Sequence, residues 1–226
     1  MGYTVIEGAT GAVAVRQELF VPRGDSCLLM RLTVTNETQD TKEIDLFPYV
    51  EFCFWDAMDD ATNLQRNLSI GEVEVCGRAI YHKTEYRERR DHYAVLWADQ
   101  DPDGFDTARD AFIGVYGSPA RPEAVVNGGC TGSTAQGWAP VGAMQFHLKL
   151  EGGGEEQIIL GLGYVENSQE EKWAAPGVVN KARAEAMMDR YAGGGHFDDA
   201  LRALGRFWEG RLSIFSLRSG EEKLDR

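Results

Sequence analysis

The stretch CLLMRLTVTN, residues 27 to 36, carries an apolar side chain at every second position. Successive side chains of an extended strand point to opposite faces, so Leu28, Met30, Leu32 and Val34 share one face. The turn-rich segment NETQD then leads into EIDLFPYVEFCFW, residues 43 to 55, which has the same period. Its apolar face comprises Ile44, Leu46, Val50, Phe52 and Phe54. The two segments predict neighbouring antiparallel strands with one buried face.

The same period of two recurs in short segments up to about residue 167. In GAVAVRQELFVP (11–22), Val13, Val15, Leu19 and Val21 lie on one side. The other predicted strands are GYTVIE (2–7), GEVEVCG (71–77), RAIYHKT (78–84), HYAVLWAD (92–99), AMQFHLKL (143–150) and EEQIILGLGYVE (155–166). No helix of crossover length separates any two of them, which favours a large antiparallel β-sandwich of the all-β class. The segment DTARDAF (106–112) predicts a helical turn within a loop.

From about residue 168 the apolar period changes to that of amphipathic helices. VVNKARAEAMMDRYA (178–192) places Val179, Ala182, Ala186 and Met187 along one stripe. After GGG comes HFDDALRALGRFWEGRLSIF (196–215), for which we expect Asp198 to be the N-cap. Its apolar residues recur at spacings of three and four: Phe197, Leu201, Leu204, Trp208, Leu212 and Phe215. We therefore predict two C-terminal helices, the second packing this stripe against an apolar surface.

Composition and charge narrow the class of protein. The chain has 226 residues and a formal net charge of -13. A field of this sign repels phosphate backbones and anionic lipids, so nucleic acid and membrane surfaces are not expected partners. The four cysteines, Cys27, Cys53, Cys76 and Cys130, form no C-x-x-C pair and are expected to be buried thiols in a reducing compartment. The start MGYTVIEGAT lacks a signal-peptide pattern. Together these features indicate a cytoplasmic protein.

The sequence lacks the short motifs that mark common catalytic sites, including the P-loop, G-x-S-x-G and H-E-x-x-H. His82 and Glu85 would diverge on opposite faces of a strand, so we expect no metal site. The charged run KTEYRERRDHY (83–93) is interpreted as a solvated, salt-bridged strand end in preference to a partner contact.

One loop is unusually rich in groups that hydrogen-bond. FCFWDAMDDATNLQRNLS (52–69) follows an aromatic strand and contains three acids, two asparagines and a glutamine. Planar acids and amides beside an aromatic face are what a sugar site needs. Adjacent Asp59 and Asp60 point to opposite faces and cannot flank one glycosidic bond as an acid/base pair. A solvated connection remains the alternative reading of this loop.

Several long segments resemble the cellobiose and cellodextrin phosphorylases of glycoside hydrolase family 94, formerly glycosyltransferase family 36. These segments are YVEFCFWDAMDDATNLQRNLSIGEVEV (49–75), AIYHKTEYRERRDHYAV (79–95), GFDTARDAFIGVYG (104–117), GWAPVG (137–142), LGYVEN (162–167), EEKW (170–173) and EEKLDR (221–226). The resemblance implies a galactose-mutarotase-like super-sandwich over residues 1–167, without the family's first strands. It also implies that residues 168–226 are a helical linker leading to an α/α barrel that this chain does not contain.

The activity that this resemblance implies is inverting phosphorolysis of β-1,4-glucosides, with inorganic phosphate as co-substrate and no cofactor. Phosphate is itself the nucleophile, so one carboxylic acid suffices. That acid and the phosphate ligands belong to the family's barrel, so no catalytic residue is assigned here and the chain alone is expected to be inactive. The alternative is a stand-alone carbohydrate-binding or structural module.

The resemblance also gives the polar loop a role. In the family's homodimer this loop edges the acceptor-sugar site of the other subunit, and the matching positions are Asp56, Asn63 and Gln65. The expected partners are therefore a β-glucan oligosaccharide, a second copy of the chain and the catalytic barrel. The family often has Asn at the position of Asp56 and an aromatic residue at that of Leu64, so these two positions bear on the choice of acceptor.

Overall fold

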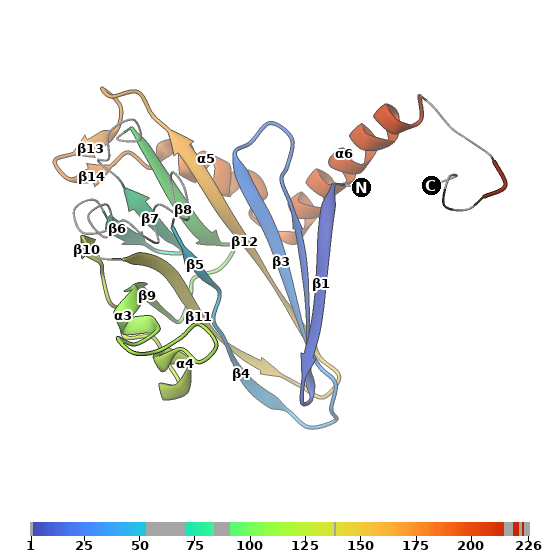
Figure 1. Ribbon diagram of the computed structural model, residues 1–226, viewed down its shortest axis with the longest axis horizontal. Coiled ribbons are helices and arrows are strands. Elements are labelled where there is room, and N and C mark those ends of the chain that lie inside the picture. The colour runs from blue at the N-terminus through green and yellow to red at the C-terminus, as the bar shows by residue number, and fades with distance from the viewer. Residues whose placement is uncertain are drawn as a thin grey trace.

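The alternating segments form two antiparallel sheets in the computed structural model (Figure 1). The structure describes residues 2–52, 71–83, 91–137, 139–214, 219–221 and 223. Within these ranges a large sheet has the strand order β1-β2-β3-β12-β8-β7-β6-β10. In a smaller sheet β11 pairs with β4, β5 and β9. The expected all-β sandwich is confirmed.

Most strands lie where the period of two predicts them. The prediction that the strands at 27–36 and 43–55 are antiparallel neighbours was wrong, because β3 pairs with β2 and β12 whereas β4 pairs with β11 in the other sheet. The large sheet contains β1 (Tyr3–Thr10), β2 (Val13–Phe20), β3 (Cys27–Asn36), β12 (Glu155–Glu166), β8 (His92–Ala98), β7 (Ala79–Lys83), β6 (Gly71–Cys76) and β10 (Gln136–Gly137). The small sheet contains β4 (Lys42–Leu46), β5 (Tyr49–Glu51), β9 (Gly104–Ala108) and β11 (Pro140–Leu150). Strands β9 and β10 were not predicted, nor was a hairpin of β13 (Trp173–Ala175) and β14 (Val178–Val179).

Four helices are described. The two short ones are α3 (Arg109–Phe112) and α4 (Glu123–Asn127), and the two C-terminal ones are α5 (Ala182–Tyr191) and α6 (Gly194–Leu212). The predicted helical turn at 106–112 is confirmed only from Arg109 onward, because Gly104–Ala108 is paired with β11 as strand β9. Both expected C-terminal helices are present.

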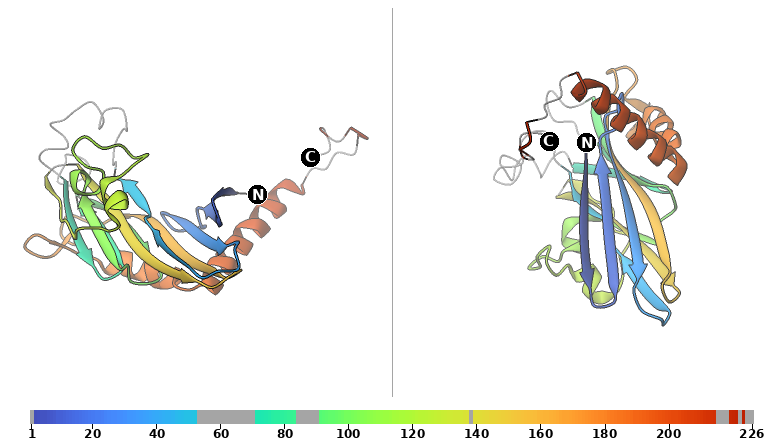
Figure 2. Two further views of the ribbon diagram at one scale, coloured as in Figure 1. Left: turned by 90° about the horizontal axis from the view of Figure 1, so that it is seen from below. Right: turned by 90° about the vertical axis from the view of Figure 1, so that its right-hand side faces the viewer.

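The elements stack in four layers, with the small sheet and α3–α4 on one side of the large sheet and α5–α6 on the other (Figure 2). Leu32, Val34 and Ile158 belong to the core between the sheets, as the period predicts. Cys27 and Leu29, from the opposite face of β3, pack with α5 and α6. Both faces of the central strands are therefore buried, which explains why they are apolar at nearly every position.

The large sheet depends on close contact between β12 and β8. Gly161 is paired with Trp97, which is fully buried. A Cβ atom on Gly161 would overlap the indole ring of Trp97. Glycine is needed here because the large indole occupies the space above its Cα.

Helix α5 forms as predicted, and Val179 and Met187 of its predicted stripe are buried, but the other two members of that stripe are not. The buried side chains are Ala184, Met187, Met188 and Tyr191, whereas Ala182 and Ala186 are exposed. The observed spacing of three, four and seven is the ideal helical stripe. The sequence alone did not show which of two faces of α5 is buried, because alanines lie on both faces and carry little hydrophobic signal.

Helix α6 differs from the prediction at both ends. It begins at Gly194, so Asp198 is not its N-cap. Instead Asp198 accepts a hydrogen bond of 2.8 Å from Arg31 on β3, and Arg31 also pairs with Glu18 on β2 at 2.6 Å. Phe197 and Leu204 are buried and Leu201 is half-buried, but Trp208 and Leu212 are exposed. The prediction that the whole stripe is buried was wrong, because the C-terminal half of α6 extends beyond the sheet.

Two smaller expectations also need correction. Cys27 is buried and Cys130 is half-buried, but Cys76 at the end of β6 is exposed, so the thiols are not uniformly buried. Val21, expected on a buried face, lies just after β2 and is exposed. Cys53 lies outside the described residues.

Candidate functional site

The polar loop predicted to contact sugar connects β5 to β6. Asp56, Asn63 and Gln65 all lie outside the described residues, so their positions remain a prediction. The structure does define where the chain leaves and re-enters the sheets, at Phe52 and Gly71. The candidate site is therefore built from the side chains around these two points.

Phe52, where the chain leaves the small sheet, is part of an aromatic stack. Phe52 lies parallel to the imidazole of His82 on β7, with ring centroids 4.9 Å apart. Burial lowers the pKa of His82 to about 3. His82 is therefore neutral at physiological pH and serves as an aromatic surface rather than as a charged ligand for an anion.

Beside this stack, two side chains of β5 and one of α3 form a connected group. The Tyr49 hydroxyl donates to Glu51 Oε1 at 2.6 Å, and Arg109 Nε donates to the same oxygen at 3.1 Å. The Tyr49 ring stacks on Phe112 of α3, with centroids 5.1 Å apart. Burial, followed by the neighbouring Glu51, raises the pKa of Tyr49, so the phenol stays protonated and donates. These contacts fix the end of β5 from which the predicted loop leaves.

The chain re-enters the large sheet at Gly71, beside a loop that is held by hydrogen bonds to a buried carboxylate. Asp106 on β9 accepts hydrogen bonds from the Thr131 hydroxyl at 2.6 Å and from the backbone N–H groups of Thr131 and Ser133, both at 3.0 Å. Thr107 Oγ1 accepts from Ala135 N at 2.8 Å. This loop leads into β10, whose Gly137 is paired with Gly71. The buried polar groups thus hold the backbone against which the predicted loop rejoins the large sheet.

The charged run at 83–93 is only partly as expected. Lys83 is salt-bridged to Glu72 and Glu74, each at 3.2 Å, but it is buried rather than solvated. Lys83 also donates to Gly177 O at 2.6 Å, which ties the β13–β14 hairpin to β7. Residues 84–90 lie outside the described part of the chain. The described end of the run is therefore a packed junction between two elements.

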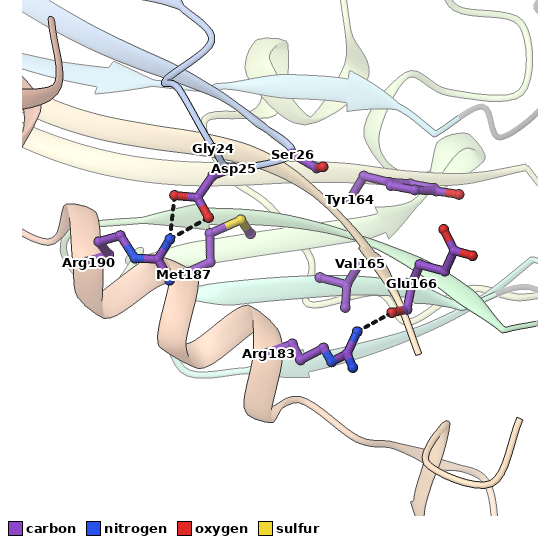
Figure 3. A pocket seen from close by; sticks show the side chains of 9 residues that line it. All are labelled: Gly24, Asp25, Ser26, Tyr164, Val165, Glu166, Arg183, Met187 and Arg190. Atoms are coloured by element: carbon purple, nitrogen blue, oxygen red, sulfur yellow. Dashed lines mark hydrogen bonds and ion pairs between the residues drawn. The ribbon is translucent and has the colours of Figure 1, made fainter. Parts of the chain in front are cut away.

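A hollow lies on the opposite side of the large sheet, between α5 and the ends of β3 and β12 (Figure 3). It measures about 320 Å³. Arg190 binds Asp25 at 2.5 Å, and Arg183 donates to the Glu166 carbonyl at 2.6 Å. Met187, between the two arginines, packs in the core. Each guanidinium thus already has an acceptor on the sheet, which makes this hollow a helix-to-sheet junction.

Within the described residues, no group of three or more His, Cys, Asp or Glu side chains could hold a metal ion. His92 contacts the Tyr164 hydroxyl through Nδ1 and lies 3.5 Å from Glu166 through Nε2. His147 pairs with Asp45 at 3.3 Å. Each of these two imidazoles contacts one carboxylate, as in ordinary side-chain pairing.

The sequence matches a family model, the glycosyl hydrolase 94 supersandwich domain, over residues 1–193. The chain belongs to the glycosyl hydrolase 94 family. The match ends at the start of α6 and includes both sheets, the β13–β14 hairpin and α5. It also includes every residue described above for the candidate site.

Curated relatives of this family member are phosphorylases. An N,N'-diacetylchitobiose phosphorylase of Vibrio proteolyticus is 26% identical over 226 residues, which is 100% of this chain and 26% of that protein. A solabiose phosphorylase of Paenibacillus borealis is 29% identical over 157 residues, 69% of this chain and 20% of that protein. The chain thus spans about a quarter of the length of the curated relatives it matches.

A solved structure confirms the fold of this family 94 domain. A putative kojibiose phosphorylase from the human microbiome has a TM-score of 0.55 and 9% sequence identity, covering 92% of this chain and 23% of that one. At this identity the likeness establishes the fold alone. No described helix is both long and apolar enough to span a membrane.

Sequence reasoning missed most of the polar framework around the predicted family 94 loop. Asp106 is 25 and 27 residues away in sequence from Thr131 and Ser133, and it contacts them only in the folded structure. A weak signal was available in G-F-D-T-A, residues 104–108, of which the last three residues were predicted as part of a helical turn. The stack of Phe52 on His82 had no sequence signal, because it depends on how the two sheets pack.

Proposed function

We propose that this chain is the supersandwich part of a disaccharide phosphorylase that performs inverting phosphorolysis and releases α-glucose 1-phosphate. The observation that carries the proposal is the family 94 match over residues 1–193, together with curated relatives that are all phosphorylases. Phosphate is the co-substrate and no cofactor is needed. The proposed division is a super-sandwich at residues 1–167 and a helical linker at 168–226 that leads to a catalytic barrel.

The proposed role of the domain is to border the acceptor side of an active site in a second subunit. Asp56, Asn63 and Gln65 would bind sugar hydroxyls through their carboxylate and amide groups. This role is supported by the contacts that hold the backbone at both ends of the loop. The Phe52–His82 stack and the Asp106 network limit the freedom of those two ends, which lowers the entropy cost of binding a sugar.

Cellobiose or a cellodextrin is the substrate we propose first, because the long motifs of this sequence resemble the phosphorylases of those sugars. N,N'-diacetylchitobiose is the second candidate, because that disaccharide appears in the names of relatives that align with the whole chain. A cytoplasmic location is proposed from the scattered cysteines and the lack of a secretory start. The alternative function is a stand-alone carbohydrate-binding module.

The test is phosphorolysis of cellobiose, cellotriose and N,N'-diacetylchitobiose, measured as release of the sugar 1-phosphate. We expect no turnover by residues 1–226 alone, because the proposed catalytic groups belong to another domain. The polypeptide encoded by the complete reading frame should release glucose 1-phosphate from cellobiose. Sugar binding by residues 1–226 in calorimetry, with a reading frame that encodes no further domain, would favour the stand-alone module instead.

Asn63→Ala in the complete protein tests the loop itself. We expect the KM for the acceptor in the synthetic direction to rise about two- to tenfold, as for the loss of a neutral hydrogen bond worth roughly 0.5–1.5 kcal/mol. The melting temperature should stay unchanged. Asn127→Ala at the end of α4 is the matched control and should change neither quantity. A large fall in melting temperature with unchanged acceptor kinetics would make the loop structural.

A further inference from the structure

The β13–β14 hairpin reverses the usual placement of apolar and charged side chains. Trp173, the first residue of β13, exposes 37% of its surface, whereas Lys172 before it and Lys83 on β7 expose only 2% and 6%. Burying an ammonium group costs free energy, and so does leaving a large aromatic ring in water. An element that departs from both rules at one place is typical of a binding site.

Both buried ammonium groups lie close to the exposed indole. Lys172 Nζ is 4.5 Å and Lys83 Nζ is 5.6 Å from the centroid of the Trp173 ring. An indole attracts cations at these distances, so the two lysines restrict the orientation of the Trp173 side chain. A ring that is already ordered loses little entropy when a ligand stacks against it.

The backbone of the hairpin is also held in place. Its turn contains Pro176, whose ring fixes its own φ, and Gly177, whose φ of 74° lies in the left-handed region that glycine favours. Gly177 O accepts a hydrogen bond from Lys83, and Val179 N–H donates to Glu74 on β6 at 2.8 Å. The hairpin is therefore fixed to the two paired strands β6 and β7.

The hairpin lies beside the point where the predicted sugar-binding loop rejoins the large sheet. Lys83, which bonds to the hairpin at Gly177, also pairs with Glu72 at 3.2 Å. Glu72 directly follows Gly71, the residue at which the chain re-enters the sheet. Figure 1 shows β13 and β14 at the same end of the molecule as β6 and β7. The hairpin and the re-entry point are thus neighbours in the fold.

The groups around the indole favour a neutral sugar over other ligands. Glu72, which pairs with Lys83, and Glu171 both hold exposed carboxylates, and these repel an anion. An aromatic face bordered by carboxylate and ammonium groups can stack against the C–H face of a pyranose ring and bond to its hydroxyls. A stable protein interface buries about 800 Å² per partner, which is more than one indole on a short hairpin supplies.

We propose that Trp173 stacks against a pyranose ring of a neutral, β-linked oligosaccharide. The inference rests on the proposed function, because it extends the sugar-contacting surface from the predicted loop to the hairpin. In a β-1,4-linked glucoside the ring substituents are equatorial, so each ring presents a flat C–H face to an indole. The loop and the hairpin would contact separate rings, so the affinity should rise with the length of the sugar chain.

Titration calorimetry of residues 1–226 with cellobiose and cellotetraose tests the proposal. Cellotetraose should bind more tightly than cellobiose, and Trp173→Ala should weaken its binding about three- to tenfold, as for the loss of one aromatic contact. Trp173→Phe, which keeps a ring, should weaken it less. Trp208→Ala is the matched control, because Trp208 on α6 is exposed to nearly the same extent, at 38%, and this variant should bind cellotetraose like the wild type. Equal binding by Trp173→Ala and the wild type, or no binding by the wild type, overturns the proposal.

A measurement on the unaltered protein keeps the test valid if Trp173→Ala does not fold. In NMR spectra the indole N–H resonance of Trp173 should shift during the titration with cellotetraose, and that of Trp208 should not. A shift that depends on protein concentration but not on the sugar would show that a second copy covers Trp173, and would overturn the proposal.

Phosphorolysis of cellobiose by the complete protein separates this inference from the proposed function. Phosphorolysis without Trp173-dependent binding of cellotetraose would reject the stacking site alone. Trp173-dependent binding without phosphorolysis would support the stacking site and reject the proposed function.

Discussion

At the residue scale, the contact of Gly161 with Trp97 is the most demanding position in the large sheet. We expect Gly161→Ala to destabilise the protein by about 1–3 kcal/mol, the usual cost of overpacking a core. The indole is fully buried and lies directly over the glycine, so neither side can move away cheaply. Chemical denaturation measures this change. Gly8→Ala on β1, where an added Cβ meets nothing within 4 Å, is the control and should cost far less. Equal effects would contradict the role of the contact.

Glu74 gives a second residue-scale prediction, concerning pH. Burial alone would raise its pKa, but hydrogen bonds from Lys181, Val179 N–H and Lys83 outweigh burial and lower it below its usual 4.5. A carboxyl with a depressed folded-state pKa contributes stability above its unfolded-state pKa and loses it as the pH falls through the folded value. Wild-type stability should therefore fall as the pH drops below about 4.5, and Glu74→Gln should flatten that dependence. The melting temperature is measured between pH 3 and pH 7. Glu7→Gln, at an exposed site, is the control. A slope of melting temperature against pH that is the same in Glu74→Gln as in the wild type would refute the prediction.

At the scale of elements, α6 divides into a packed half and an exposed half. We expect Leu204→Ala to destabilise residues 1–226 by about 2–5 kcal/mol, because it leaves a cavity beneath the helix. Leu212→Ala removes the same atoms from an exposed site and is the matched control, with an expected cost under about 0.5 kcal/mol in this chain. Urea denaturation of the two variants measures the difference. Equal destabilisation would mean that the exposed half is packed in solution.

The elements also show how much of the fold the sequence could predict. Alternation in CLLMRLTVTN located β3 and its inner face, because Leu32 and Val34 are large and their outward neighbours include Arg31 and Thr33. The same reasoning could not predict which face of α5 is buried or which residue pairs with Asp198. Each depends on which surface the helix meets, and Arg31 approaches Asp198 only after β3 and α6 have packed together. The Asp106 network escaped prediction for the same reason, since its donors are more than twenty residues away in sequence.

At the scale of the whole molecule, the two sides of the sandwich differ in what covers them. On one side α5 and α6 pack against the large sheet, and Trp208 and Leu212 of α6 are exposed. The other side presents the small sheet, α3 and α4 (Figure 2). Between α3 and the end of α4 it exposes Val115, Tyr116, Val125 and Val126. Exposed valines and a tyrosine that lie close together on this side form a surface of the kind that interaction sites have.

The second subunit is the last prediction: we expect a homodimer in which the small-sheet side, not the β1 edge, forms the contact. In the described part of the chain β1 pairs only with β2, so its outer edge has unpaired backbone groups that could accept another strand. The net charge of -13 opposes such unspecific pairing, whereas the exposed valines and Tyr116 favour burial on the other side. Light scattering across a concentration series, at low and high salt, should therefore detect a dimer. Val126→Glu should weaken it at least tenfold, and Ile6→Lys on β1 should leave it intact. A monomer under all conditions would refute the dimer, and the opposite ranking of the two variants would show that it forms through the sheet edge.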